Sequence, residues 1–106
     1  MPNYVTKYTY YEFLDRIQKL YNKSKQLDLK AANLDESGFS DLHVLMRIIT
    51  EADALILELR LLVSQSTVDL SNDNEQALII HNAAGILEKL LLLKDAMQGI
   101  FDEVVS

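Results

Sequence analysis

The chain has no cysteine, which excludes a disulfide framework, a thiolate nucleophile and a thiolate metal ligand. It has one proline and only three glycines, Gly38, Gly85 and Gly99. Phosphate-cradling loops need clustered glycines, and these three are scattered. No Gly-x-Ser-x-Gly turn is present either. The sequence therefore offers none of the usual local signatures of catalysis.

Long apolar runs are also missing. The longest uninterrupted ones have four residues, whereas a membrane-spanning helix needs about 20. No apolar stretch typical of a secretory signal follows Met1. Together with the absence of cysteine, this pattern predicts a cytoplasmic protein without a membrane span.

The chain does contain three stretches in which apolar residues recur at alternating spacings of four and three. They cover residues 13–34, 42–63 and 79–104. This average period of 3.5 residues is typical of long helices packed side by side. It predicts an all-α fold, an antiparallel bundle of three helices over 10–34, 41–65 and 73–104, complete in one chain or completed by dimerisation. A length of 106 residues corresponds to one domain, 1–106, in which residues 1–8 form an N-terminal arm.

Helix-start signals precede each stretch. Thr9 and Glu12 have the spacing of a capping box. Ser40 is the expected N-cap of the second helix, and Asn72 or Asp73 that of the third.

Charge is unevenly distributed along the chain, whose net charge is −6. Residues 1–30 carry a net charge of +3 and residues 31–106 a net charge of −9. The acidic body disfavours nucleic-acid binding, which needs clustered Lys and Arg. A basic first helix fits the acidic second and third helices, within one chain or between subunits. Nucleic-acid binding through this helix stays as an alternative, and its candidate residues are Arg16, Lys19, Lys23 and Lys30.

Few residues are suited to metal or acid–base chemistry. The two histidines, His43 and His81, belong to no Glu-x-x-His or His-Glu-x-x-His motif. His81, Glu88 and Asp95 recur every seven residues and share one helix face, so an enzymatic or metal-binding bundle that uses them is the alternative hypothesis. The favoured expectation is a non-catalytic protein with no cofactor and no metal.

Two features favour protein–protein binding. All five tyrosines lie within the first 21 residues, and tyrosine beside basic residues is typical of binding surfaces. The second helix carries more apolar residues than one buried face needs, and the surplus marks an interface if it stays exposed. The candidate partner-binding residues are Tyr4, Tyr8, Tyr11, Met46, Leu57 and Leu61.

A run of small residues, Ala83-Ala84-Gly85, permits close approach of another helix. A tight crossing within the chain is the expected reason, and a dimer contact is the alternative. The sequence as a whole predicts a small acidic helical bundle that acts by binding another protein, in the manner of an adaptor, a chaperone or an antitoxin or immunity protein. It is expected to form a homodimer.

Overall fold

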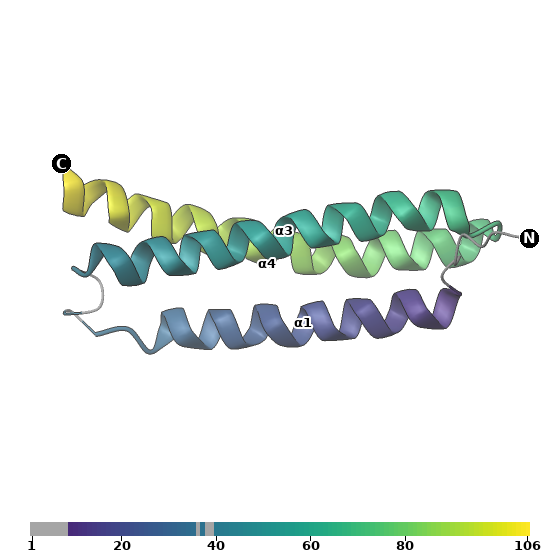
Figure 1. The fold of residues 1–106 in the computed structure, drawn as a ribbon, viewed down its shortest axis with the longest axis horizontal. Helices are drawn as coiled ribbons and strands as arrows, with labels where there is room; N and C mark the ends of the chain where they lie inside the picture. Colours follow the sequence, from purple (N-terminus) through teal and green to yellow (C-terminus); the bar gives the residue numbers. More distant parts are fainter. Residues whose placement is uncertain (1–8, 36, 38–39) are drawn as a thin grey trace, which may run out of the picture.

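The computed structural model describes residues 9–35, 37 and 40–106. Three helices, α1 (Tyr10–Ala32), α3 (Leu42–Asp69) and α4 (Asp73–Val105), account for most of them. They lie side by side with alternating directions in a body of 55 × 28 × 20 Å (Figure 1). The predicted all-α bundle of three long helices is confirmed.

The predicted capping box at the start of α1 is confirmed. The backbone N–H of Glu12 donates to the Thr9 hydroxyl, the backbone N–H of Thr9 donates to the Glu12 carboxylate, and both distances are 3.2 Å. Asn72 caps α4, because its side-chain oxygen accepts from the backbone N–H groups of Asn74 and Glu75. These caps satisfy backbone donors that a helix start leaves unpaired.

The predicted cap of the second helix was wrong by one residue. Asp41, not Ser40, is the N-cap of α3, and its carboxylate accepts from the backbone N–H of His43 at 2.9 Å and of Val44 at 3.4 Å. A carboxylate at this position is also favoured by the positive end of the helix dipole.

The second helix also runs further than its predicted end near residue 65, to Asp69. A run of polar residues suggested that the helix ends near residue 65. Two hydroxyl groups of this run instead donate hydrogen bonds to carbonyl groups of the same helix. Ser66 donates to the Val63 carbonyl at 2.7 Å and Thr67 to the Ser64 carbonyl at 2.8 Å. Because Ser66 is also fully buried, the helix continues and only residues 70–72 connect α3 to α4.

The core follows the predicted period. Among the apolar residues at this spacing, Leu42 and Val104 are exposed, since they lie at the end of the bundle far from the α3–α4 connection. Four others are half-buried: Leu34, Val63, Leu93 and Ile100. The largest fully buried apolar side chains come from all three helices and are Phe13, Leu45, Ile48, Leu59, Ile79 and Leu90.

The predicted tight crossing at Ala83-Ala84-Gly85 is not found. Only Ala83 is buried, and a Cβ atom added to Gly85 would have no heavy atom of another element within 4 Å. The helix period turns Ala83 toward the core and Gly85 away from it. α4 passes without interruption through both Gly85 and Gly99.

By length and composition alone, α4 is long and apolar enough to cross a membrane. The core helix of a soluble bundle meets the same criterion, and α4 contributes Ile79, Ala83 and Leu90 to the core. The absence of a membrane span therefore stays a prediction.

Candidate functional site

An exposed apolar row runs along α3 on the side away from the core. The three residues predicted from the sequence belong to it: Met46 is 46% exposed, Leu57 59% and Leu61 56%. Val68 extends the row by seven residues beyond Leu61 and is exposed as well. We call these four residues the outer stripe. The sequence reading missed Val68 because it ended the helix before that residue.

A groove between α1 and α3 adjoins the outer stripe. It consists of two hollows of about 780 and 310 Å³, and Lys23 lines both of them. Leu61 belongs to the groove and to the outer stripe at once. We call the two hollows together the α1–α3 groove. Its buried apolar lining consists of Leu20, Leu27, Leu55 and Leu62.

The two walls of the groove carry opposite charge. The α1 wall has four basic residues and two acidic ones, whereas the α3 wall has two glutamates and no basic residue. Arg47 stands one turn before Glu51 and does not line the groove. The charged residues of the α1 wall are Glu12, Asp15, Arg16, Lys19, Lys23 and Lys30, and those of the α3 wall are Glu51 and Glu58.

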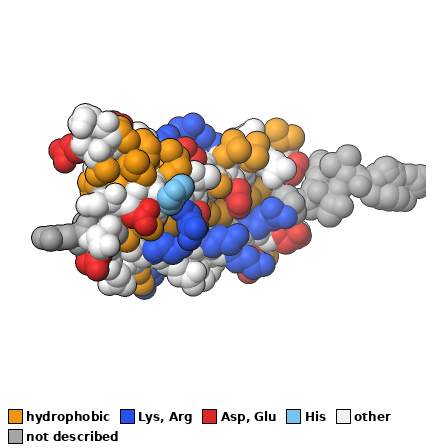
Figure 2. Space-filling model, turned by 60° about the vertical axis from the view of Figure 1, so that its left-hand side comes forward, with side chains coloured by type: hydrophobic (Ala, Val, Ile, Leu, Met, Phe, Trp, Pro, Cys, Tyr) orange, Lys and Arg blue, Asp and Glu red, His pale blue; other side chains and the backbone are white. Residues whose placement is uncertain are grey.

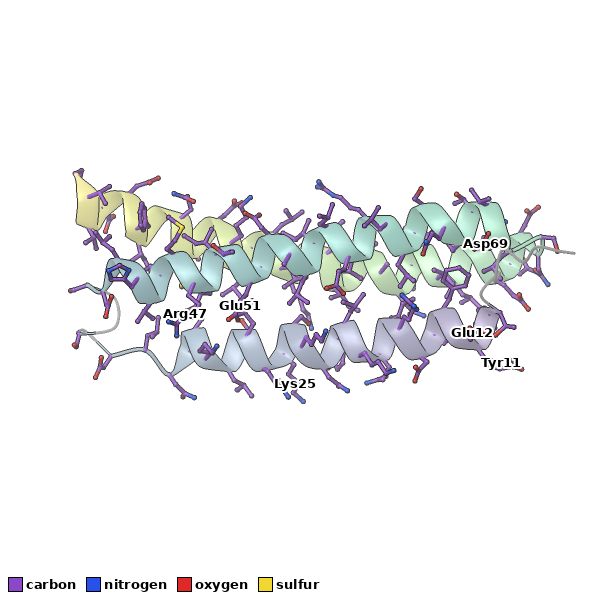
Figure 3. All side chains as sticks on the ribbon, viewed as in Figure 1. Tyr11, Glu12, Lys25, Arg47, Glu51 and Asp69 are labelled. Carbon is purple, nitrogen blue, oxygen red and sulfur yellow. The ribbon has the colours of Figure 1, made fainter. Side chains whose placement is uncertain are left out.

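Ion pairs neutralise part of this charge. Glu51 reaches from α3 toward α1 (Figure 3) and pairs with Lys30 at 3.5 Å, and both residues line the smaller hollow. Lys19 pairs with Asp15 on its own helix at 3.1 Å. A band of Lys and Arg side chains crosses one face of the molecule, with apolar patches above it (Figure 2). The basic first helix therefore faces an acidic wall of the same chain, in line with the predicted complementarity.

Tyr11 comes from α1 and joins this surface. Its side chain is exposed, it lines the larger hollow with Leu61, and its ring meets that of Tyr10 edge-on at 5.7 Å between centroids. The fold thus brings together two predicted partner-binding residues that are 50 positions apart in the sequence. Tyr4 and Tyr8 lie outside the described residues.

His81, Glu88 and Asp95 do share one exposed face of α4, as predicted. Seven residues of helix correspond to about 10 Å of rise, which is too far for neighbouring side chains to bind one metal ion. Across residues 9–35, 37 and 40–106, no three His, Asp or Glu side chains gather as metal ligands.

A third hollow of about 580 Å³ lies between α1 and α4, and no sequence pattern predicted it. Gly85 and the partly exposed Tyr21 line it, together with Ile17 and Ile86. Its charged lining is a single lysine, Lys89, so it lacks the opposed walls of the α1–α3 groove.

No family model matches the chain, and no curated protein or solved structure shows significant similarity to it.

Proposed function

We propose that this chain is a small, non-catalytic cytoplasmic bundle that acts by protein–protein binding, with the outer stripe of α3 as its contact surface. The observation that carries the proposal is the exposure of Leu57 and Leu61 on a helix whose opposite face is fully buried. Folding of one chain leaves these leucines in water. An exposed apolar row of this kind is typical of an interface.

Homodimerisation is the form of binding that we favour. Burial of a leucine side chain contributes about 1.5–3 kcal/mol when it is complete, and Leu57 and Leu61 have more than half of their surface left to bury. A symmetric pair counts each residue twice, which doubles the apolar surface that a short stripe can bury.

The two other hypotheses have less support. The basic residues of α1 stand among acidic groups in the α1–α3 groove, whereas a phosphate backbone attracts a uniformly basic surface. The face of His81, Glu88 and Asp95 spreads its groups along a helix instead of converging on one point.

The test is the solution mass by light scattering over a dilution series, for the wild type and for Leu57→Lys/Leu61→Lys. We expect a wild-type dimer and, for the variant, a dissociation constant raised by about 100-fold or more. Circular dichroism should show unchanged helicity, because both leucines lie outside the core.

The matched control is Leu78→Lys/Leu92→Lys, which places the same two charges on exposed leucines of α4. It should leave the dimer intact. A wild type that is monomeric at every concentration would contradict the homodimer. If a photo-crosslinker at position 57 also captured nothing in cells of the chain's own organism, the binding function itself would be refuted.

A further inference from the structure

The α1–α3 groove and the outer stripe share a residue and therefore form one continuous surface. Leu61 borders both, and Leu57 stands one turn before it on α3. Glu58 lies between these two leucines in the sequence and lines the groove. A partner that covers Leu57 and Leu61 therefore also reaches the edge of the groove at Glu58.

We propose that the groove receives α3 of a second copy, reciprocally, about a two-fold axis. This inference rests on the proposed function and specifies its partner. In such a pair, Leu57 and Leu61 of one copy pack against the rim of the other groove, where Tyr11 and Leu61 are exposed. Glu58 of that inserted helix then approaches the basic α1 wall, which presents Lys19 and Lys23.

Charge complementarity selects this occupant. Lys30 and Glu51 already pair within one chain, so the α1 wall keeps an excess of one positive charge and the α3 wall keeps one negative charge, that of Glu58. A two-fold axis that sets α3 beside α1 of the partner pairs each wall with its opposite, twice. The same surface is therefore complementary to itself, which an isologous dimer requires.

α4 of a second copy is the competing occupant, since its outer face carries Glu88, Asp95 and Asp102. That face lies on the opposite side of the bundle from the α1–α3 groove, because α4 packs against both α1 and α3 from behind. An α4 helix in the groove would make a head-to-tail contact, which produces a ring or an open chain of copies and not a two-fold dimer. A closed dimer requires α3 instead.

The experiment exchanges charges between the two walls. Lys23→Glu makes the α1 wall more acidic, and Glu58→Lys makes the α3 wall basic. Each variant alone should dimerise about 10-fold more weakly than the wild type in low salt, because an attraction becomes a repulsion at two symmetric places. An equimolar mixture of the two, one of them isotope-labelled and detected by native mass spectrometry, should form heterodimers with near wild-type affinity.

A second variant separates the interface from any effect inside one chain. The double substitution Lys23→Glu/Glu58→Lys should restore a homodimer with itself, yet it should pair poorly with the wild type. The difference in dissociation constant between these two pairings should shrink as salt is raised from 0.05 to 0.5 M. Over this range the screening length falls from ~14 to ~4 Å.

Matched controls carry the same charge changes elsewhere. Lys25→Glu lies on α1 but points away from α3 (Figure 3), and Glu88→Lys lies on the outer face of α4. Neither should alter dimerisation, and neither should rescue Lys23→Glu or Glu58→Lys in a mixture. Rescue of Lys23→Glu by Glu88→Lys would overturn the proposal in favour of an α4 contact.

Two further results would also overturn it. If Leu57→Lys/Leu61→Lys abolished dimerisation while the charge exchanges had no effect, the groove would not be the binding site, although the proposed function would stand. A wild-type chain that stays monomeric at all concentrations would exclude a second copy as the occupant.

Discussion

Both faces of α3 carry large apolar side chains, but other helices of the same chain cover only one of these faces. Leu45, Ile48 and Leu59 on the inner face are at most 1% exposed. Leu57 and Leu61 on the outer face keep more than half of their surface in water. Residue type therefore does not distinguish these leucines, and only their rotation about the helix axis does.

This difference separates two contributions to stability. Contacts of the inner face form when one chain folds, so they contribute to the free energy of unfolding of the monomer. Contacts of the outer face can form only with a partner, so they contribute to the free energy of association. Substitutions on the inner face should therefore change the free energy of unfolding, and substitutions on the outer face should change the dissociation constant.

The largest effect is expected from truncating an inner leucine. Leu59→Ala should lower the free energy of unfolding by about 2–5 kcal/mol, because it removes buried methyl groups and leaves a cavity. Leu57→Ala, two residues earlier, should lower it by less than about 1 kcal/mol. Urea denaturation at a concentration where the chain is monomeric measures both values. Equal losses would show that the outer face also packs within the chain.

A smaller effect is expected from overfilling α4. Ala83 is buried and Ala84 is exposed, so the two neighbours form a matched pair. Ala83→Leu should cost about 1–3 kcal/mol by overpacking, whereas Ala84→Leu should stay within about 0.5 kcal/mol of the wild type. Thermal melting of the two variants compares them directly. A reversed order would show that Ala84, and not Ala83, faces the core.

The smallest effect is expected at Gly85. Gly85→Ala should raise the free energy of unfolding by about 0.5–1 kcal/mol, because alanine favours a helix interior and the added methyl group has open space around it. A rise of the melting temperature by a few degrees would record this gain. A decrease in melting temperature that appears only at high protein concentration would instead reveal a partner packed against this glycine.

The sequence predicted the fold well because the heptad pattern reports the buried face of each helix directly. Thr9 and Glu12 fixed the start of α1, since a capping box is a local device. The end of α3 was predicted too early, because the hydroxyls of Ser66 and Thr67 bond within the helix and Ser66 is buried. Burial by another helix cannot be read from a local run of polar residues.

The candidate site was predicted only in part. Met46, Leu57 and Leu61 were identifiable because α3 has more apolar positions than its inner face can hold. The α1–α3 groove was not identifiable from the sequence, since it depends on which sides of two helices, far apart in the sequence, face each other in the fold. Lys23 and Glu58 are 35 residues apart, and no local spacing relates them. The basic row on α1 was visible, but the glutamates opposite it became known only from the packing.

An odd number of antiparallel helices places the first residue of α1 and the last residue of α4 at opposite ends of the bundle (Figure 1). The body between them is 55 Å long. Whatever is joined before Tyr10 and whatever is joined after Val105 would be held apart by most of this length. The bundle thus has the geometry of a stiff spacer, in addition to its proposed role in binding, since three packed helices bend far less than a flexible linker of the same span.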